Sequence, residues 1–124
     1  MPWSQEVTED GKTLKVKFSG SLTAEESSAS TSEILTVMLE HKITRVLLDS
    51  YDAHFEAPII GIYKLPDIYE ARGIPRNTRA AVVLPKDSYR LEIYEFYEDV
   101  CRNRGYFVKL FEKADEAWAW LQET

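Results

Sequence analysis

Several features that would narrow the function are scarce in this sequence of 124 residues. Its one cysteine, Cys101, excludes a disulfide within the chain and is typical of a reducing compartment, so we expect a cytoplasmic protein. No apolar run approaches the roughly 20 residues that span a bilayer, and residues 1–10 are polar and acidic. We therefore expect neither a signal peptide nor an integral membrane protein.

Basic charge is also scarce. The chain has 15 lysines and arginines against 21 aspartates and glutamates, which gives a net charge of −6. A nucleic-acid binder needs a basic surface that displaces counterions. Docking on anionic membranes also needs a basic surface. We therefore expect no nucleic acid and no anionic membrane among the partners.

Apolar residues, in contrast, are plentiful. They make up 44% of the sequence, which is enough to build a hydrophobic core. The length suits one domain that covers residues 1–124, and no internal repeat, linker or low-complexity segment is visible.

The N-terminal part of the chain predicts a β-hairpin. Leu14, Val16 and Phe18 alternate with polar residues, which is the period-two pattern of a strand with one wet face. A turn signal at residues 9–12 separates this strand from a shorter one over residues 3–8. We expect the hairpin to form an antiparallel edge of a sheet.

The stretch over residues 44–58 predicts the centre of that sheet. Its apolar run, residues 46–48, is typical of a strand buried on both faces, which we expect over residues 44–49. The polar residues that follow predict a loop, and Pro58 fits the first turn of a helix. Ligands of open α/β sheets bind outside the carboxyl ends of the strands, so we expect any site to lie here.

Helices and strands alternate in the remaining chain. Thr23 and Glu26 fit a capping box at the start of the first helix. Pro66 is expected to kink or restart the second helix, and Asp87 or Ser88 is expected to cap the third. We expect helices over residues 23–39, 58–73, 88–104 and 113–122, and further strands over residues 79–84 and 106–111. The resulting order, β-β-α-β-α-β-α-β-α, predicts an α/β fold with a mixed, mostly parallel sheet of four or five strands and about four helices.

Four short passages, in order along nearly the whole chain, carry a family resemblance. They are LTAEE at residues 22–26, VLLD at residues 46–49 with DA at 52–53, RAAVV at residues 79–83, and VKLF at residues 108–111 with EAWAWL at 116–121. Together they resemble the SpoIIAA-like branch of the STAS family, as found in small bacterial STAS-like proteins. The resemblance implies a small sheet with helices and a regulatory or interaction role instead of catalysis, with lipids or other small molecules as ligands of some relatives.

The sequence departs from one branch of that family. Anti-sigma-factor antagonists carry a phosphorylatable serine at the start of the helix after the central strand. Here the corresponding place reads Glu56-Ala57-Pro58, and no serine or threonine occurs from Tyr51 to Asn77. We therefore expect this chain to lack the phosphorylation switch.

Reactive side chains gather where the central strands end. The candidate ligand-binding residues are Asp49, Ser50, Asp52, His54, Glu56, Lys86 and Tyr89. Lys86 and Tyr89, with Ser88 and Arg90, could line an anion-receptive cleft beside helix N-termini. The alternative is that these groups cap helices and bind solvent.

A small hydrolase is a second interpretation of the same residues. Ser50 and His54, with Asp49 or Asp52, could supply a nucleophile, a base and an orienting acid if Ser50 Oγ lies within about 3 Å of a His54 nitrogen. The spacing matches no established motif such as HExxH or GxSxG. We therefore expect no catalytic residue, no metal and no cofactor.

Aromatic and small residues suggest further surfaces. Five tyrosines on two helices could line a cleft for an apolar ligand with a polar head: Tyr63, Tyr69, Tyr89, Tyr94 and Tyr97. Trp118 is expected to point away from the core, where it could contact a protein partner or a second copy of the chain. The serines near residue 30 are expected to form a solvated helix face, with a modification site as the alternative, and Cys101 is expected to be buried and inert.

These observations favour a non-enzymatic STAS-like module that binds a protein partner or a small amphipathic or anionic ligand. The alternatives are the hydrolase and a purely structural homodimer, joined through the hairpin edge or the Trp118 face.

Overall fold

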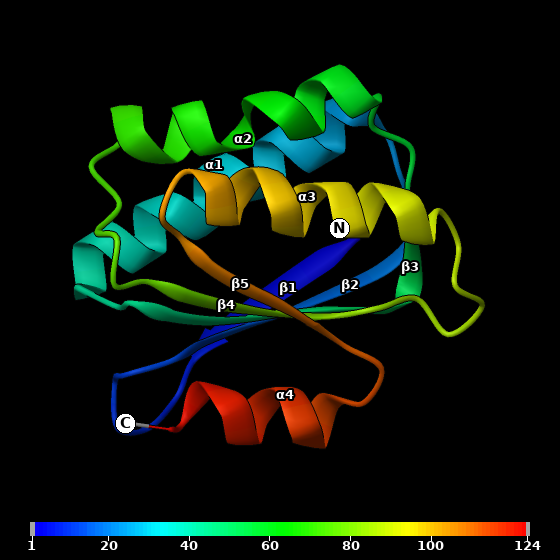
Figure 1. Ribbon diagram of the computed structural model, residues 1–124. Coiled ribbons are helices and arrows are strands. Elements are labelled where there is room, and N and C mark those ends of the chain that lie inside the picture. Colours follow the sequence, from blue (N-terminus) through cyan, green and yellow to red (C-terminus); the bar gives the residue numbers. More distant parts are fainter. Residues whose placement is uncertain (1, 124) are drawn as a thin grey trace.

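The computed structural model describes residues 2–123 and shows an alternating α/β chain (Figure 1). Within these residues it has five strands and four helices, in the order that the sequence predicts. The elements are β1 (Trp3–Val7), β2 (Leu14–Leu22), α1 (Ala24–His41), β3 (Arg45–Phe55), α2 (Ile59–Ala71), β4 (Arg79–Val83), α3 (Leu91–Asn103), β5 (Phe107–Phe111) and α4 (Ala114–Leu121).

The strands form one mixed sheet in the order β1-β2-β3-β4-β5. β1 and β2 pair antiparallel as the predicted hairpin, and the other neighbours are parallel. Val46 lies opposite Ala80 and Leu48 lies opposite Val82, so the two central strands are adjacent and run the same way. The predicted fold class is confirmed.

The helices cover the sheet unequally. Figure 1 shows α1, α2 and α3 on one face and α4 alone on the other. Alternation along each strand sends successive side chains to opposite faces, so Val46 joins the core under the three helices while Leu47 joins a smaller core under α4. The Thr23–Glu26 capping box at the start of α1 is present as predicted.

Strand β3 is longer than the sequence predicts. Residues 52–55 pair with residues 19–22 of β2, so the predicted loop after Asp49 is wrong for this segment. A β-bulge between the two paired regions reverses the alternation. Ser50 therefore faces α1–α3 before the bulge, and Ala53 and Phe55 face them after it. Pairing with β2 thus overrides the turn-like composition of Asp-Ser-Tyr-Asp.

Two helix predictions also differ from the structure. α2 is one continuous helix through the buried Pro66, so it does not restart there. α3 begins only at Leu91, and its N-cap is Arg90 in the left-handed conformation, so neither Asp87 nor Ser88 caps it. Asp87 Oδ1 instead accepts a hydrogen bond from the Tyr89 backbone N–H, at 3.1 Å, within the preceding loop.

Candidate functional site

A large cavity separates the sheet from the three helices that cover it. Its volume is about 650 Å³, and most of its surface is apolar. The strands form its floor, α1 and α3 form its sides, and α2 forms its roof. Side chains from the floor and from α1 that line it include Val46, Leu48, Ala80, Val82, Ile34 and Met38. We call this space the interlayer cavity.

Two local features leave this volume unfilled. The first turns of α1 carry small side chains, and residues 27, 28, 30, 31 and 32 all line the cavity. Ser30 is only 2% exposed, so the prediction of a solvated serine face is wrong at this position. In addition, α2 packs against α3 and not down onto the sheet. The small side chains at the start of α1 and the distance between α2 and the sheet together create the interlayer cavity.

Three hydroxyl groups in the cavity wall lack partners. Ser27 Oγ, Thr78 Oγ1 and the Tyr94 hydroxyl are buried and make no hydrogen bond with any described residue. A buried polar group without a partner costs about 1–3 kcal/mol, and such groups are rare in native proteins. Burial raises the pKa of Tyr94 to about 12, against a smaller lowering by the nearby Ser50 hydroxyl. Tyr94 is therefore a neutral phenol that can donate a hydrogen bond.

Two other tyrosines of the cavity bond to each other. The hydroxyls of Tyr69 and Tyr97 lie 2.7 Å apart, and burial raises the pKa of both. Three of the five predicted cleft tyrosines thus line the cavity, namely Tyr69, Tyr94 and Tyr97. Tyr63 lies outside it, 58% exposed, and Tyr89 lies on the other side of β3 with His54.

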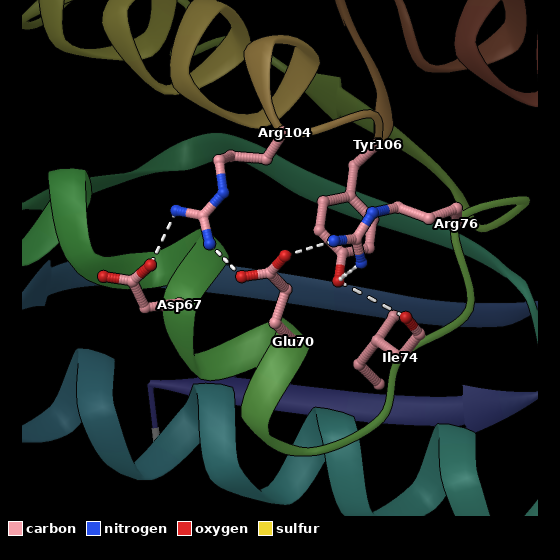
Figure 2. A network of polar contacts seen from close by, with 6 residues as sticks. All are labelled: Asp67, Glu70, Ile74, Arg76, Arg104 and Tyr106. Carbon is pink, nitrogen blue, oxygen red and sulfur yellow. Dashed lines mark hydrogen bonds and ion pairs between the residues drawn. The ribbon is translucent and has the colours of Figure 1, made fainter.

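The roof of the cavity is held at one end. Figure 2 shows Glu70 of α2 accepting hydrogen bonds from Arg76 and from Arg104 at the end of α3. Asp67, one turn earlier, accepts a second bond from Arg104 at 2.6 Å. The guanidinium of Arg76 also stacks on the ring of Tyr106, 4.3 Å from its centroid. These contacts tie the C-terminal half of α2 to α3 and to the start of β5.

The N-terminal half of α2 is held more lightly. Ile59, Ile60 and Tyr63 are 51%, 57% and 58% exposed, and no side chain caps the helix at Pro58. The proline ring of Pro66 also removes a backbone donor in the middle of the helix. The roof therefore has its least constrained turns over the carboxyl ends of the strands.

The structure divides the predicted site residues into three groups. The first is a cluster of ion pairs on the α4 side of the sheet. Lys17 lies 3.4 Å from Asp49 and 3.1 Å from Asp52, and Lys86 lies 3.3 Å from Asp52. Hydrogen bonds from Lys17 and Lys86 lower the pKa of Asp52, and the Asp52 carboxylate raises the pKa of Lys17.

The second group lies at the end of β3. His54 Nε2 is 2.7 Å from Asp87 Oδ2, and the His54 ring stacks on Tyr89 with centroids 4.0 Å apart. The Tyr89 hydroxyl donates to Glu56 at 2.9 Å, and this carboxylate raises the pKa of Tyr89. These contacts fasten the loop before α3 to the end of β3.

Ser50 stands alone as the third group. It is 2% exposed and lines the interlayer cavity, whereas His54, beyond the bulge, pairs with Asp87 on the opposite side of the strand. The structure records no hydrogen bond between Ser50 and His54. The arrangement therefore gives no support to the Ser50–His54 hydrolase.

A second hollow does lie at the carboxyl ends of the strands. It measures about 630 Å³ and is lined by Lys17, Asp49 and Lys86 together with residues 112–114. Its cations already face carboxylates, and its lining is more polar than that of the interlayer cavity. It is less suited to an apolar ligand.

Trp118 and Cys101 are both more enclosed than free surface residues. Trp118 is half-buried against the Leu47 side of the sheet, with Lys15 Nζ 4.9 Å from its ring centroid, so it does not point away from the core. Its role at an interface stays a prediction. Cys101 is fully buried, and burial raises the pKa of its thiol to about 12.

Residues 2–123 contain neither a cluster of metal ligands nor a helix that could cross a membrane. There, no three histidine, cysteine, aspartate or glutamate side chains come together as metal ligands. Over the same residues, every helix is too short or too polar to pass through a bilayer.

Comparison with known proteins rests on structure. No protein-family model and no curated protein sequence matches this chain. The structure of the anti-sigma factor antagonist SpoIIAA in its unphosphorylated form superposes with a TM-score of 0.64 at 13% identity, over 98% of this chain and 99% of that one. The chain has a SpoIIAA-like fold. A DUF3478-family protein from Shewanella loihica PV-4, also described as SpoIIAA-like, gives a TM-score of 0.59 at 20% identity, over 96% and 91% of the two chains.

This likeness confirms the predicted resemblance at the level of the fold. Identity this low says nothing about individual site residues. Of the interlayer cavity, the sequence predicted the tyrosine side, where Tyr69, Tyr94 and Tyr97 lie, but not the wall formed by the start of α1. Two signals could have revealed the rest of the cavity: the run of small residues at the start of α1, and the apolar composition of α2 on nearly all sides. Of the predicted ligand-binding residues, only Ser50 lines the cavity.

Proposed function

We propose that this chain is a non-enzymatic SpoIIAA-like module that binds a small amphipathic molecule in the interlayer cavity. One observation carries the proposal: an apolar hollow of about 650 Å³ whose wall holds hydroxyls without partners. Small-molecule pockets typically measure about 300–1,000 Å³, with apolar walls and a few placed polar groups. The apolar part of this wall offers water no hydrogen-bond partner and therefore suits the apolar chain of an amphiphile, while the hydroxyls suit its polar head.

A regulatory role is part of this proposal. The SpoIIAA protein of similar fold is described as an anti-sigma factor antagonist. In this chain Pro58 caps α2, and residues 51–77 contain no hydroxyl side chain of serine or threonine. We propose that ligand occupancy, and not phosphorylation at this helix start, controls the module.

A protein partner is the second candidate. Ile59 and Tyr63 of α2 are 51% and 58% exposed and lie outside the cavity, while Ile60 and Ile68 line the cavity and are still more than 40% exposed. Grouped exposed apolar side chains of this kind are typical of interaction sites. This surface lies over the roof of the cavity, so one helix would connect ligand occupancy with partner binding.

The experiment measures binding of 1-decanol, a neutral amphiphile, by isothermal titration calorimetry. Ala80 lies on the cavity floor, so Ala80→Phe should fill part of the hollow and weaken binding at least about tenfold, since the ring displaces apolar contact area. Ala119→Phe is the matched control, because Ala119 is exposed on α4 across the sheet. It should leave the affinity unchanged.

Two results would contradict the proposal. The wild-type protein could fail to bind either 1-decanol or decanoate, or both phenylalanine variants could bind 1-decanol as tightly as the wild type. Urea unfolding of each variant checks that the fold is retained.

A further inference from the structure

The charged residues of the interlayer cavity are all of one sign. Lys64, Arg72 and Arg90 line it, and none of the described lining residues is an aspartate or glutamate. This is unexpected by composition, because acidic residues outnumber basic ones by 21 to 15 in the whole chain. A low-dielectric hollow with only basic groups favours an anionic guest.

We infer that the ligand is an anionic amphiphile, of which a long-chain carboxylate is the simplest, with its headgroup beside Arg90, Tyr94 and Ser27 and its apolar chain running toward Met38. This inference rests on the proposed function and specifies the ligand class and its orientation in the same cavity.

Topology places the three headgroup residues at one end of the cavity. Ser27 lies in the first turn of α1, directly after β2, and Tyr94 lies in the first turns of α3. Arg90 Nη1 donates to the Phe55 carbonyl at the end of β3, 2.7 Å away. All three therefore lie where the strands end, whereas Met38 lies near the other end of α1.

These residues offer hydrogen-bond donors, and the nearby Asp87 carboxylate, whose charge acts on Tyr94, is already paired with His54. The guanidinium of Arg90 has five N–H donors, and only Nη1 has a partner among the described residues. The Tyr94 and Ser27 hydroxyls are buried and unpaired. A carboxylate accepts several hydrogen bonds, so it would satisfy both hydroxyls and pair with the arginine.

The backbone before α3 supports this placement of Arg90. Ser88 and Arg90 both have positive φ, 59° and 53°, although neither is glycine. Non-glycine residues in this conformation are strained and are concentrated at ligand clamps. The contacts of Asp87 with His54 and of Tyr89 with Glu56 hold this loop in place.

The opposite end of the cavity is less suited to the headgroup. Arg72 Nη2 donates to the Thr36 hydroxyl at 2.9 Å, and Arg90 also has one partner, so the two guanidinium groups do not differ in this respect. The difference lies in the unpaired hydroxyls, because only Thr78 offers one near Arg72, whereas Ser27 and Tyr94 offer two near Arg90. Arg72 is therefore the matched control for Arg90.

The test compares sodium decanoate with 1-decanol, which share a chain length and differ in headgroup charge, by calorimetry at pH 8 below their aggregation concentrations. The wild-type protein should bind decanoate at least about tenfold more tightly, because hydrogen bonds to a charged group contribute about 1.5–3 kcal/mol. Arg90→Gln and Tyr94→Phe should each remove most of this difference, and Arg72→Gln should retain it.

Tyr94→Phe keeps the test decisive if Arg90→Gln does not fold. It removes an unsatisfied buried hydroxyl, so its urea midpoint should equal or exceed that of the wild type while its affinity for decanoate falls. The inference is overturned if 1-decanol binds and decanoate binds no more tightly, or if Arg72→Gln and not Arg90→Gln removes the difference. Failure of both probes would instead overturn the proposed function.

Discussion

The carboxylate of Glu70 joins the cavity roof to the rest of the domain. It accepts hydrogen bonds from Arg76 and Arg104 (Figure 2), and its side chain is 37% exposed, as is that of Arg104. Exposed ion pairs contribute about 0.2–1 kcal/mol each, so Glu70→Gln should lower the free energy of unfolding by about 1 kcal/mol. Salt screens such pairs, and the loss should shrink between 0.05 M and 1 M NaCl.

Urea unfolding at both salt concentrations measures this loss. Glu95→Gln on α3 is the control, since Glu95 is exposed and makes no ion pair with a described residue. Hydrogen exchange of the α2 amides should also quicken in Glu70→Gln, because the helix loses contacts to its neighbour. A loss above about 3 kcal/mol, a loss independent of salt, or unchanged exchange in α2 would refute this reasoning.

Three further predictions concern other groups. Tyr69→Phe should lower the free energy of unfolding by about 1–3 kcal/mol because it leaves the buried Tyr97 hydroxyl without its partner. The Tyr69→Phe/Tyr97→Phe double variant should have a higher urea midpoint than the sum of the two single losses predicts. The pKa of Asp52 is lowered below its usual 3.8, so its ion pairs stabilise the folded state above about pH 4 and are lost as pH falls through the lowered pKa. Asp52→Asn should therefore reduce the fall in the free energy of unfolding between about pH 4 and lower pH, measured by urea unfolding. Cys101, with a pKa of about 12, should resist a thiol reagent at pH 8 until urea is added, and rapid labelling of the native protein would contradict its burial.

Local patterns were enough to predict the architecture. The alternation of Leu14, Val16 and Phe18 identified β2 because one face of that strand is buried and the other is wet. The capping box at Thr23 marked the start of α1 because it satisfies backbone N–H groups within a single turn. Each of these signals depends on neighbours in sequence, which is why the order of elements could be predicted.

Features that depend on distant contacts could not be predicted. Asp52 and His54 continue β3 only because residues 19–22 of β2 lie beside them. The bulge that sends Ser50 to one side and His54 to the other depends on the same pairing. The interlayer cavity depends on how α2 rests on α3, and the apolar residues of α2 are as typical of a packed core as of a cavity roof.

Methyl chemical shifts on titration with decanoate test the binding cavity most directly. Methyl groups of Ile34, Met38 and Val82 line the cavity, whereas those of Val83 and Leu121 lie in the core under α4. If the interlayer cavity binds the amphiphile, the first set should shift and show intermolecular contacts with the decanoate chain while the second set stays unchanged. Shifts confined to the α4 side, or no saturable shift at all, would contradict binding in this cavity.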